Sequence, residues 1–233
     1  MTNCPYCDHP AGGTFCPNCG EKLIATKLDT FTILNGFFKS LVNLDKGILF
    51  VLKSMLLKPR EFCLLYLQGK RKGILNPIGF VFISLTLFVL LNEWISDGGA
   101  DRVSREFSDN SFRKQGYEAG LIIGDYLKYF WLFMILPLAS SAKLIFRRYT
   151  FAEHIAISAF IFGLANFVGV VGYILFEIIL VFNPLVYLII FVSLIRVYRL
   201  MEGIMEIMIL SFVVLLLFLI KMFMIIGVVI ILV

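Results

Sequence analysis

The sequence predicts an all-α polytopic membrane protein with about five transmembrane helices, a small N-terminal Cys4 zinc ribbon and interfacial amphipathic helices. Three observations predict it. Of the 233 residues, 60% are hydrophobic and 16% are charged, against about 25% charged in soluble domains. Long apolar stretches recur between short polar turns, and two C-x-x-C pairs stand near the N-terminus. We divide the chain into a ribbon (1–22), a linker with interfacial helices (23–73) and a transmembrane bundle (74–233).

The first element is a metal-binding motif made of two cysteine pairs. Cys4 and Cys7 form one C-x-x-C pair, and eight residues later Cys16 and Cys19 form the second. Two such turns can aim four thiolates at one ion, which completes the tetrahedral shell of a structural Zn²⁺. Two disulfides are the alternative, which a reducing cytoplasm disfavours. We interpret His9 as a loop residue or as a hydrogen-bond donor to the metal ligands.

The charges of the ribbon argue against nucleic-acid binding. Residues 1–22 contain Asp8 and Glu21 against Lys22, so they lack the basic stripe that phosphate contacts require. We therefore expect the ribbon to bind an unknown cytoplasmic protein.

Amphipathic segments before the first span are predicted to lie in the membrane interface. Over 30–57, apolar and polar side chains recur at helical spacing, and a helix packed on the bundle is the alternative. Cys63, in the next short helix, is interpreted as a buried apolar thiol in preference to a palmitoylation site. The nearby basic side chains are expected to contact anionic lipid headgroups. They are Lys58, Arg60, Lys70, Arg71 and Lys72.

Positive charges between the apolar stretches predict the topology. Basic residues occur at 70–72, at 147–148 and within 196–199. Because cations at the ends of membrane helices are retained inside, the N-terminus is predicted to be cytoplasmic in a multi-pass protein of a bacterial inner membrane. The fourth span is short for a full crossing, so four or six spans stay open. The predicted spans cover about 74–95, 121–146, 151–182, 184–199 and 204–233.

Polar side chains within the spans form a candidate intramembrane site, because ionisable groups are costly in a bilayer and are functional candidates by default. Glu153 and His154 begin the third span, where interfacial anchoring is the alternative role. Glu177 and Lys221 could form an ion pair, either between packed helices or along a polar path. Asn166 has glycines nearby and is expected to form an interhelical hydrogen bond.

The sequence contains no H-E-x-x-H, no G-x-S-x-G and no phosphate-binding glycine loop, so we do not expect an enzyme. The leading hypothesis is a non-catalytic integral membrane adaptor or scaffold whose zinc ribbon mediates protein contact. The alternative is a small transporter or channel that uses the polar residues of the spans. Both hypotheses are compatible with a homo-oligomer.

Three stretches together resemble a known kind of protein. They are the Cys4 ribbon, the stretch P-R-E-F-x-x-x-Y-L-Q-G-K-R-K-x-x-x-N-P at 59–77, and R-R-Y-T-F-A-E-H at 147–154. The combination resembles an uncharacterised bacterial family that pairs a ribbon with a multi-span membrane domain of unknown function. The layout is also distantly similar to Yip-type membrane-trafficking proteins, which have five spans and a cytoplasmic N-terminal region. Both resemblances imply an architecture and leave the activity open.

Overall fold

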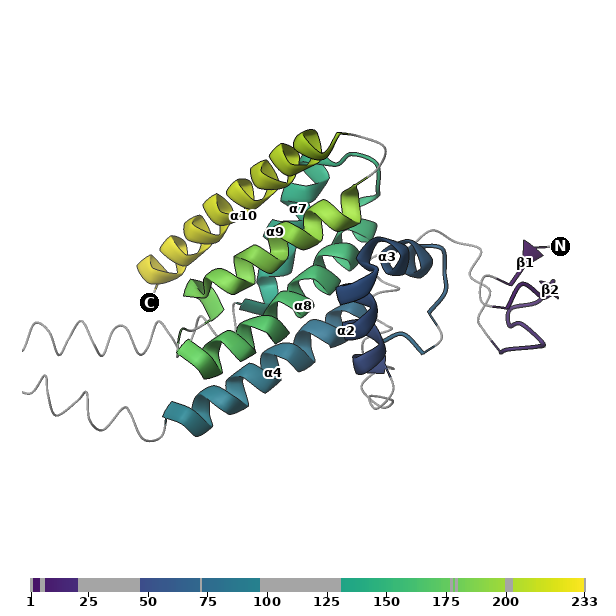
Figure 1. Ribbon diagram of the computed structural model, residues 1–233, viewed down its shortest axis with the longest axis horizontal. Helices are drawn as coiled ribbons and strands as arrows, with labels where there is room; N and C mark the ends of the chain where they lie inside the picture. The colour runs from purple at the N-terminus through teal and green to yellow at the C-terminus, as the bar shows by residue number, and fades with distance from the viewer. Residues whose placement is uncertain are drawn as a thin grey trace, which may run out of the picture.

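The computed structural model describes residues 2–4, 7–20, 47–71, 73–96, 131–176, 178, 180–199 and 203–232 (Figure 1). Near the N-terminus, two short strands pair antiparallel, β1 (Thr2–Asn3) with β2 (Pro10–Ala11). The other described elements are all helices. The helices are α2 (Gly47–Leu57), α3 (Pro59–Leu67), α4 (Pro77–Ser96), η1 (Trp131–Met134), α7 (Ile135–Ile145), α8 (Phe151–Phe176), η2 (Leu180–Phe182), α9 (Pro184–Tyr198) and α10 (Ile204–Leu232).

Three of the described helices are long and apolar enough to cross a membrane, which indicates a membrane protein. They are Pro77–Trp94, Phe151–Phe176 and Ile204–Val228, of 18, 26 and 25 residues. At about 1.5 Å per residue, even the shortest covers about 27 Å of a hydrocarbon core of roughly 30 Å. The apolar helices at 131–145 and 184–198 are shorter. Five spans therefore stay a prediction, since 121–130 lies outside the described residues.

Helix α8 is the centre of the bundle. It packs against α4, α7 and α9, whereas α10 packs against α7 and α9 on the outer side (Figure 1). In the membrane-length apolar stretch of α8, 83% of the residues are buried inside the protein, against 22% in the corresponding stretch of α10. A helix that is apolar all round suits the central position, and α10 presents an apolar outer face, as a lipid-facing helix does. Helix α8 ends at Phe176, and η2 covers the last residues of the predicted span 151–182.

Aromatic side chains join α3 and α4 to α8. The ring centroid of Phe160 on α8 lies 4.9 Å from that of Phe62 and 5.0 Å from that of Tyr66, both edge to face. Phe80 on α4 contacts the same ring at 6.3 Å. Such geometries are favourable for aromatic pairs beyond the area they bury. The short helix α3 is therefore held against the central helix by its aromatic face.

Helix α2, the described part of the predicted interfacial segment, also packs on the bundle. Val51 and Met55 are fully buried, and α2 contacts both α3 and α8. At the end of α9, Arg196 donates from its guanidinium to the last two carbonyls of α2, at 2.6 Å each. A cation there satisfies carbonyls that lack helical partners and complements the helix dipole. Over 47–57 the structure thus has the packed helix, while 30–46 lies outside the described residues.

Two Asn-Pro pairs determine where α4 and α9 begin. Oδ1 of Asn76 accepts a hydrogen bond from the backbone N–H of Ile78, and Oδ1 of Asn183 accepts one from that of Leu185, both at 3.0 Å. The proline that follows occupies the first helical position, where its missing N–H is not needed. Nδ2 of Asn183 also donates to the carbonyl of Gly169 on α8 at 3.1 Å. The Asn-Pro turn before α9 therefore ties that helix to the central one.

Candidate metal centre and polar site

The four cysteines of the ribbon lie together. Their Sγ atoms are all within 4.8 Å of one another. The Sγ atoms of Cys4 and Cys19 are 3.5 Å apart, and those of Cys7 and Cys16 are 3.6 Å apart. Sulfurs arranged tetrahedrally at about 2.3 Å from a Zn²⁺ lie about 3.8 Å from one another, whereas disulfide sulfurs are about 2 Å apart. The four side chains are free thiols that could hold a metal ion.

The two cysteine knuckles repeat one backbone turn. The N–H of Asp8 donates to the carbonyl of Cys4, and the N–H of Gly20 donates to the carbonyl of Cys16, both at 2.9 Å. Both donors have a positive φ, 62° for Asp8 and 70° for Gly20. Glycine adopts this region freely, and aspartate adopts it more readily than most residues. The repeated turn explains how two distant pairs present their sulfurs to the same point.

The backbone after the first knuckle favours a thiolate. A hydrogen bond from the backbone of His9 lowers the pKa of Cys7 from its ordinary 9.0 to about 6. At neutral pH this side chain is therefore largely in the form that binds metals. The side chain of His9 is exposed, and the backbone carbonyl of His9 accepts from the N–H of Cys4 at 2.9 Å. This geometry supports the interpretation of His9 as a loop residue.

A metal held by these four thiolates would have a closed coordination shell. Catalytic metal sites keep one position open for water or substrate, and four protein ligands leave none. Cys4 and Cys16 are also nearly inaccessible, at 1% and 2% exposed. A ribbon of this size has almost no apolar core, so it needs a bound metal ion to stabilise its fold. The arrangement can therefore stabilise a small surface, and it offers no site for a reaction at the metal.

His154, predicted as part of an intramembrane polar site, joins three elements of the bundle. The side chain is fully buried, and its Nδ1 lies 2.8 Å from the hydroxyl of Tyr198 on α9. Its Nε2 lies 2.7 Å from the backbone carbonyl of Phe146, just after α7. A carbonyl only accepts, so Nε2 carries a proton, and in the neutral ring Nδ1 accepts from the tyrosine hydroxyl. Both ring nitrogens are thus engaged, and the histidine connects α8 to α7 and α9.

Glu153 stabilises the start of α8. Its Oε2 accepts from the backbone N–H of Thr150 at 2.7 Å, and its own N–H donates to Oγ1 of Thr150 at 3.3 Å. This reciprocal pair is a capping box, which the T-x-x-E spacing before an apolar run predicts. The T-x-x-E signal at 150–153 could therefore have identified this cap from the sequence. Glu153 therefore has a local structural role at the N-terminus of α8.

Asn166 lies fully buried where α8 faces α4 and η1. Its Oδ1 accepts from Nε1–H of Trp131 at 3.0 Å, and its Nδ2 donates to Oγ of Ser84 at 3.3 Å. The expected interhelical hydrogen bond is therefore confirmed. One turn earlier, a Cβ added to Gly163 would lie 2.4 Å from Cδ1 of Phe80. The small residue lets α4 approach α8 closely enough for these bonds.

Lys221 connects the outer helix to the bundle. Its Nζ on α10 donates to Oγ of Ser140 on α7 at 2.8 Å. Glu177, its predicted partner, lies outside the described residues, so that ion pair stays a prediction. Sequence reasoning did not identify Ser140 as a partner, because a serine in an apolar helix usually bonds to its own backbone, as Ser140 also does to the carbonyl of Pro137.

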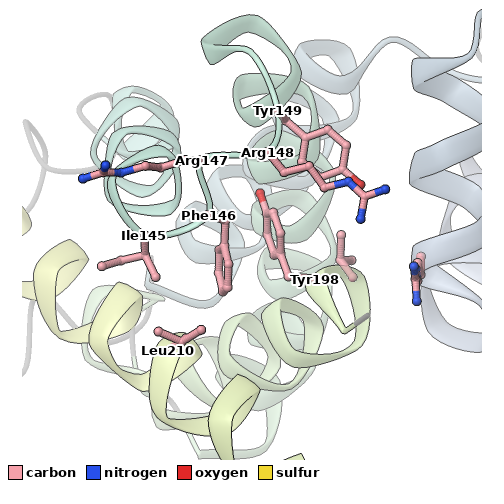
Figure 2. A pocket seen from close by; sticks show the side chains of 9 residues that line it. Ile145, Phe146, Arg147, Arg148, Tyr149, Tyr198 and Leu210 are labelled. Atoms are coloured by element: carbon pink, nitrogen blue, oxygen red, sulfur yellow. The ribbon is translucent and has the colours of Figure 1, made fainter. Parts of the chain in front are cut away.

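Basic residues collect at one end of the bundle. There the start of α3, the α7–α8 turn, the end of α9 and the start of α10 surround a cavity of about 170 Å³ (Figure 2). Arg60, from the predicted lipid-facing set, lines it together with Arg147 and Arg148. Tyr198 and Leu210 form part of its apolar wall. In the sequence, Arg147 and Arg148 indicate only the topology, so their meeting with Arg60 is a result of the fold.

The other residues that are predicted to face lipid lie between positions 58 and 72 of the sequence. Lys58 is exposed, and its Nζ lies 3.2 Å from the carboxylate of Glu61. Lys70 and Arg71 are half-buried, and the Arg71 guanidinium lies 5.4 Å from the centre of an aromatic ring of α3. Lys72 lies outside the described residues. Their contact with lipid remains a prediction.

The comparisons with curated proteins and with solved structures each find no match. A family model described as "Protein of unknown function (DUF3667)" matches residues 45–89. The matched segment covers α2, α3 and most of α4, and it includes the stretch 59–77 that carries the resemblance to an uncharacterised family. Over this part of its length, the chain is similar to a family of unknown function.

Proposed function

We propose that this chain is a non-catalytic integral membrane adaptor or scaffold, whose N-terminal ribbon binds a structural Zn²⁺ and a cytoplasmic protein. The observation that carries the proposal is the set of four thiols whose Sγ atoms all lie within 4.8 Å of one another. An all-thiolate tetrahedral site is typical of structural zinc, and a closed shell supports a binding surface and no reaction.

The surface of the ribbon offers an anchor for a protein partner. Phe15 stands directly before the second knuckle and is 60% exposed. Exposed aromatic side chains with a rigid base are frequent energetic centres of protein interfaces. The neighbouring charges are few, since Asp8 is the formally charged side chain among the described residues 7–20. An apolar partner surface therefore suits this ribbon better than a charged one.

The positions of the basic residues support a cytoplasmic ribbon. The predicted cytoplasmic residues Arg147, Arg148 and Arg196 lie at the end of the bundle that also contains α2 and the start of α3. The segment that precedes the first membrane helix thus lies at the same end of the bundle as the arginines that are predicted to be cytoplasmic. A bacterial inner membrane is the setting that this proposal assumes.

The zinc part is tested on the full chain purified in detergent. Elemental analysis should find about one zinc per chain, because four thiolates complete one shell. The double variant Cys4→Ser/Cys7→Ser should lose it. Cys63→Ala is the matched control and should keep the metal, since Cys63 is buried on α3 and is not part of the thiol cluster. Zinc retained by the double variant would contradict the site.

The adaptor part is tested by cross-linked capture from native membranes, quantified by mass spectrometry. Phe15→Ser should retain the zinc and lose the partners that wild type captures, because it removes the exposed anchor and leaves the knuckles intact. Cys4→Ser/Cys7→Ser should lose the same partners. If wild type and both variants capture identical sets, the ribbon does not mediate protein contact.

A small transporter or channel is the second candidate, and Lys221 favours it. This cation lies within the most apolar helix and bonds to a polar side chain of another helix, and ionisable residues within spans often mark transport paths. The test is solute flux in liposomes for wild type and Lys221→Met. A chain without flux, or with flux unchanged in the variant, would remove Lys221 as a path residue.

A further inference from the structure

We propose that the cavity at the basic end of the bundle binds the phosphate headgroup of an anionic phospholipid. The inference rests on the membrane placement in the proposed function and goes beyond general attraction between basic residues and lipid. It assigns a built site to Arg60, Arg147 and Arg148 (Figure 2).

The charge at the mouth of the cavity suits a phosphate. Arginine guanidinium groups match phosphate oxygens with paired N–H donors, and they do so better than ammonium groups. Arg147 and Arg148 are exposed. Their side chains extend to opposite sides of the aromatic pair between them, so the phosphate contacts Arg148 while Arg147 adds positive charge at longer range (Figure 2). Within the described part of the chain, an ion pair is found between Lys58 and Glu61, and none involves the three cavity arginines. Among the described residues, no carboxylate therefore neutralises their charge.

One part of the cavity wall is apolar, which argues for an amphiphile over a free phosphate ion. The rings of Phe146 and Tyr198 stack at 4.2 Å with 8° between their planes. Ile145, Val197 and Leu210 complete this surface. A free phosphate gains nothing from such walls, whereas the glycerol and first acyl carbons of a lipid gain by leaving water.

The size of the cavity fits the headgroup of a lipid and leaves no room for its acyl chains. Its volume of about 170 Å³ is smaller than the roughly 300–1,000 Å³ of drug-sized sites. The acyl chains would therefore lie outside it. The outer face of α10 beside it is apolar, with Ile209 60% and Phe212 58% exposed, and it offers them a path into the membrane.

The aromatic wall is preorganised for a ligand. The hydroxyl of Tyr198 bonds to Nδ1 of His154, whose Nε2 bonds to the carbonyl of Phe146. One buried histidine thus holds both stacked residues in place. A wall that is already ordered loses little conformational entropy when a lipid binds.

The test uses the full chain in a neutral detergent, titrated with phosphatidylglycerol and followed by native mass spectrometry. Phosphatidylcholine has the same phosphate with a compensating cation, so the chain should retain phosphatidylglycerol about tenfold better, because only the anionic lipid keeps its net charge for the arginines. Excess inorganic phosphate should displace little of the lipid. Equal retention of both lipids overturns the proposal. Displacement by inorganic phosphate at comparable concentrations would assign the site to a free anion and overturn the lipid.

Variants separate a built site from a general surface charge. Arg148→Gln should weaken retention about fivefold, the effect of one cation near an anionic lipid. Lys53→Gln, an equal charge loss at an exposed site on α2, should change it less than twofold because the lipid does not touch it. Leu210→Trp keeps every charge and fills the cavity, so it should weaken retention as much as Arg148→Gln. Equal losses for Lys53→Gln and Arg148→Gln, or wild-type retention by Leu210→Trp, would contradict the cavity.

The ribbon variant separates this inference from the adaptor. Cys4→Ser/Cys7→Ser should retain phosphatidylglycerol as wild type does, because it leaves the cavity residues unchanged. A chain that keeps its zinc and its partners but shows no preference for phosphatidylglycerol would overturn the lipid site alone. A chain that binds the lipid but captures no partner would overturn the adaptor alone.

Discussion

Replacing Asn166 with leucine should destabilise the bundle even though leucine has a similar volume. Asn166 is fully buried and bonds to Trp131 at 3.0 Å and to Ser84 at 3.3 Å. Hydrogen bonds between membrane helices contribute about 0.6 kcal/mol on average, and a buried donor left without a partner costs about 1–3 kcal/mol. We therefore expect Asn166→Leu to lower the free energy of unfolding by about 2 kcal/mol, mostly through the unpaired indole N–H.

A double-mutant cycle tests the reason for this loss. Asn166→Leu and Trp131→Phe, alone and combined, should show a coupling of about 1 kcal/mol, because the cycle isolates the bond between the two side chains. Trp94→Phe is the matched control, since Trp94 is 80% exposed and should not couple to Asn166. The assay is reversible unfolding in mixed micelles, followed by circular dichroism. A coupling to Trp131 no larger than that to Trp94 would refute the role of the bond.

Three further changes test packing, reactivity and capping. Gly163→Ala places a Cβ 2.4 Å from Cδ1 of Phe80, so it should destabilise the bundle by about 1–3 kcal/mol in the same assay, whereas Gly227→Ala, with nothing within 4 Å, should not. Burial raises the pKa of Cys63 to about 12, so this thiol stays protonated at pH 8 and should resist maleimide until the chain is unfolded in SDS; rapid labelling at Cys63 itself in the folded chain, located by peptide mass mapping, would contradict its burial. Glu153→Ala removes one half of the capping box and should lower thermal stability by about 1 kcal/mol, and an unchanged melting temperature would argue against that role.

Local sequence determined the features that depend on neighbours along the chain. The C-x-x-C spacing predicts four close sulfurs because each turn is short, and the structure brings Cys4 and Cys19 together as expected. Long apolar runs predict membrane helices, and three described helices have the required length and composition. The Asn-Pro pairs at 76–77 and 183–184 begin two helices by the same local hydrogen bond.

Only the tertiary structure decided which distant side chains meet. His154 and Tyr198 are 44 positions apart, Lys221 and Ser140 are 81 apart, and Arg196 reaches carbonyls about 140 positions away. Apolar membrane helices carry weak facial patterns, because lipid and protein neighbours are both apolar, so the sequence does not indicate which face meets which helix. The packing of α2, α4, α7 and α9 around α8, and of α10 against α7 and α9, selects those pairs, and with them the basic cavity that the charges alone did not reveal.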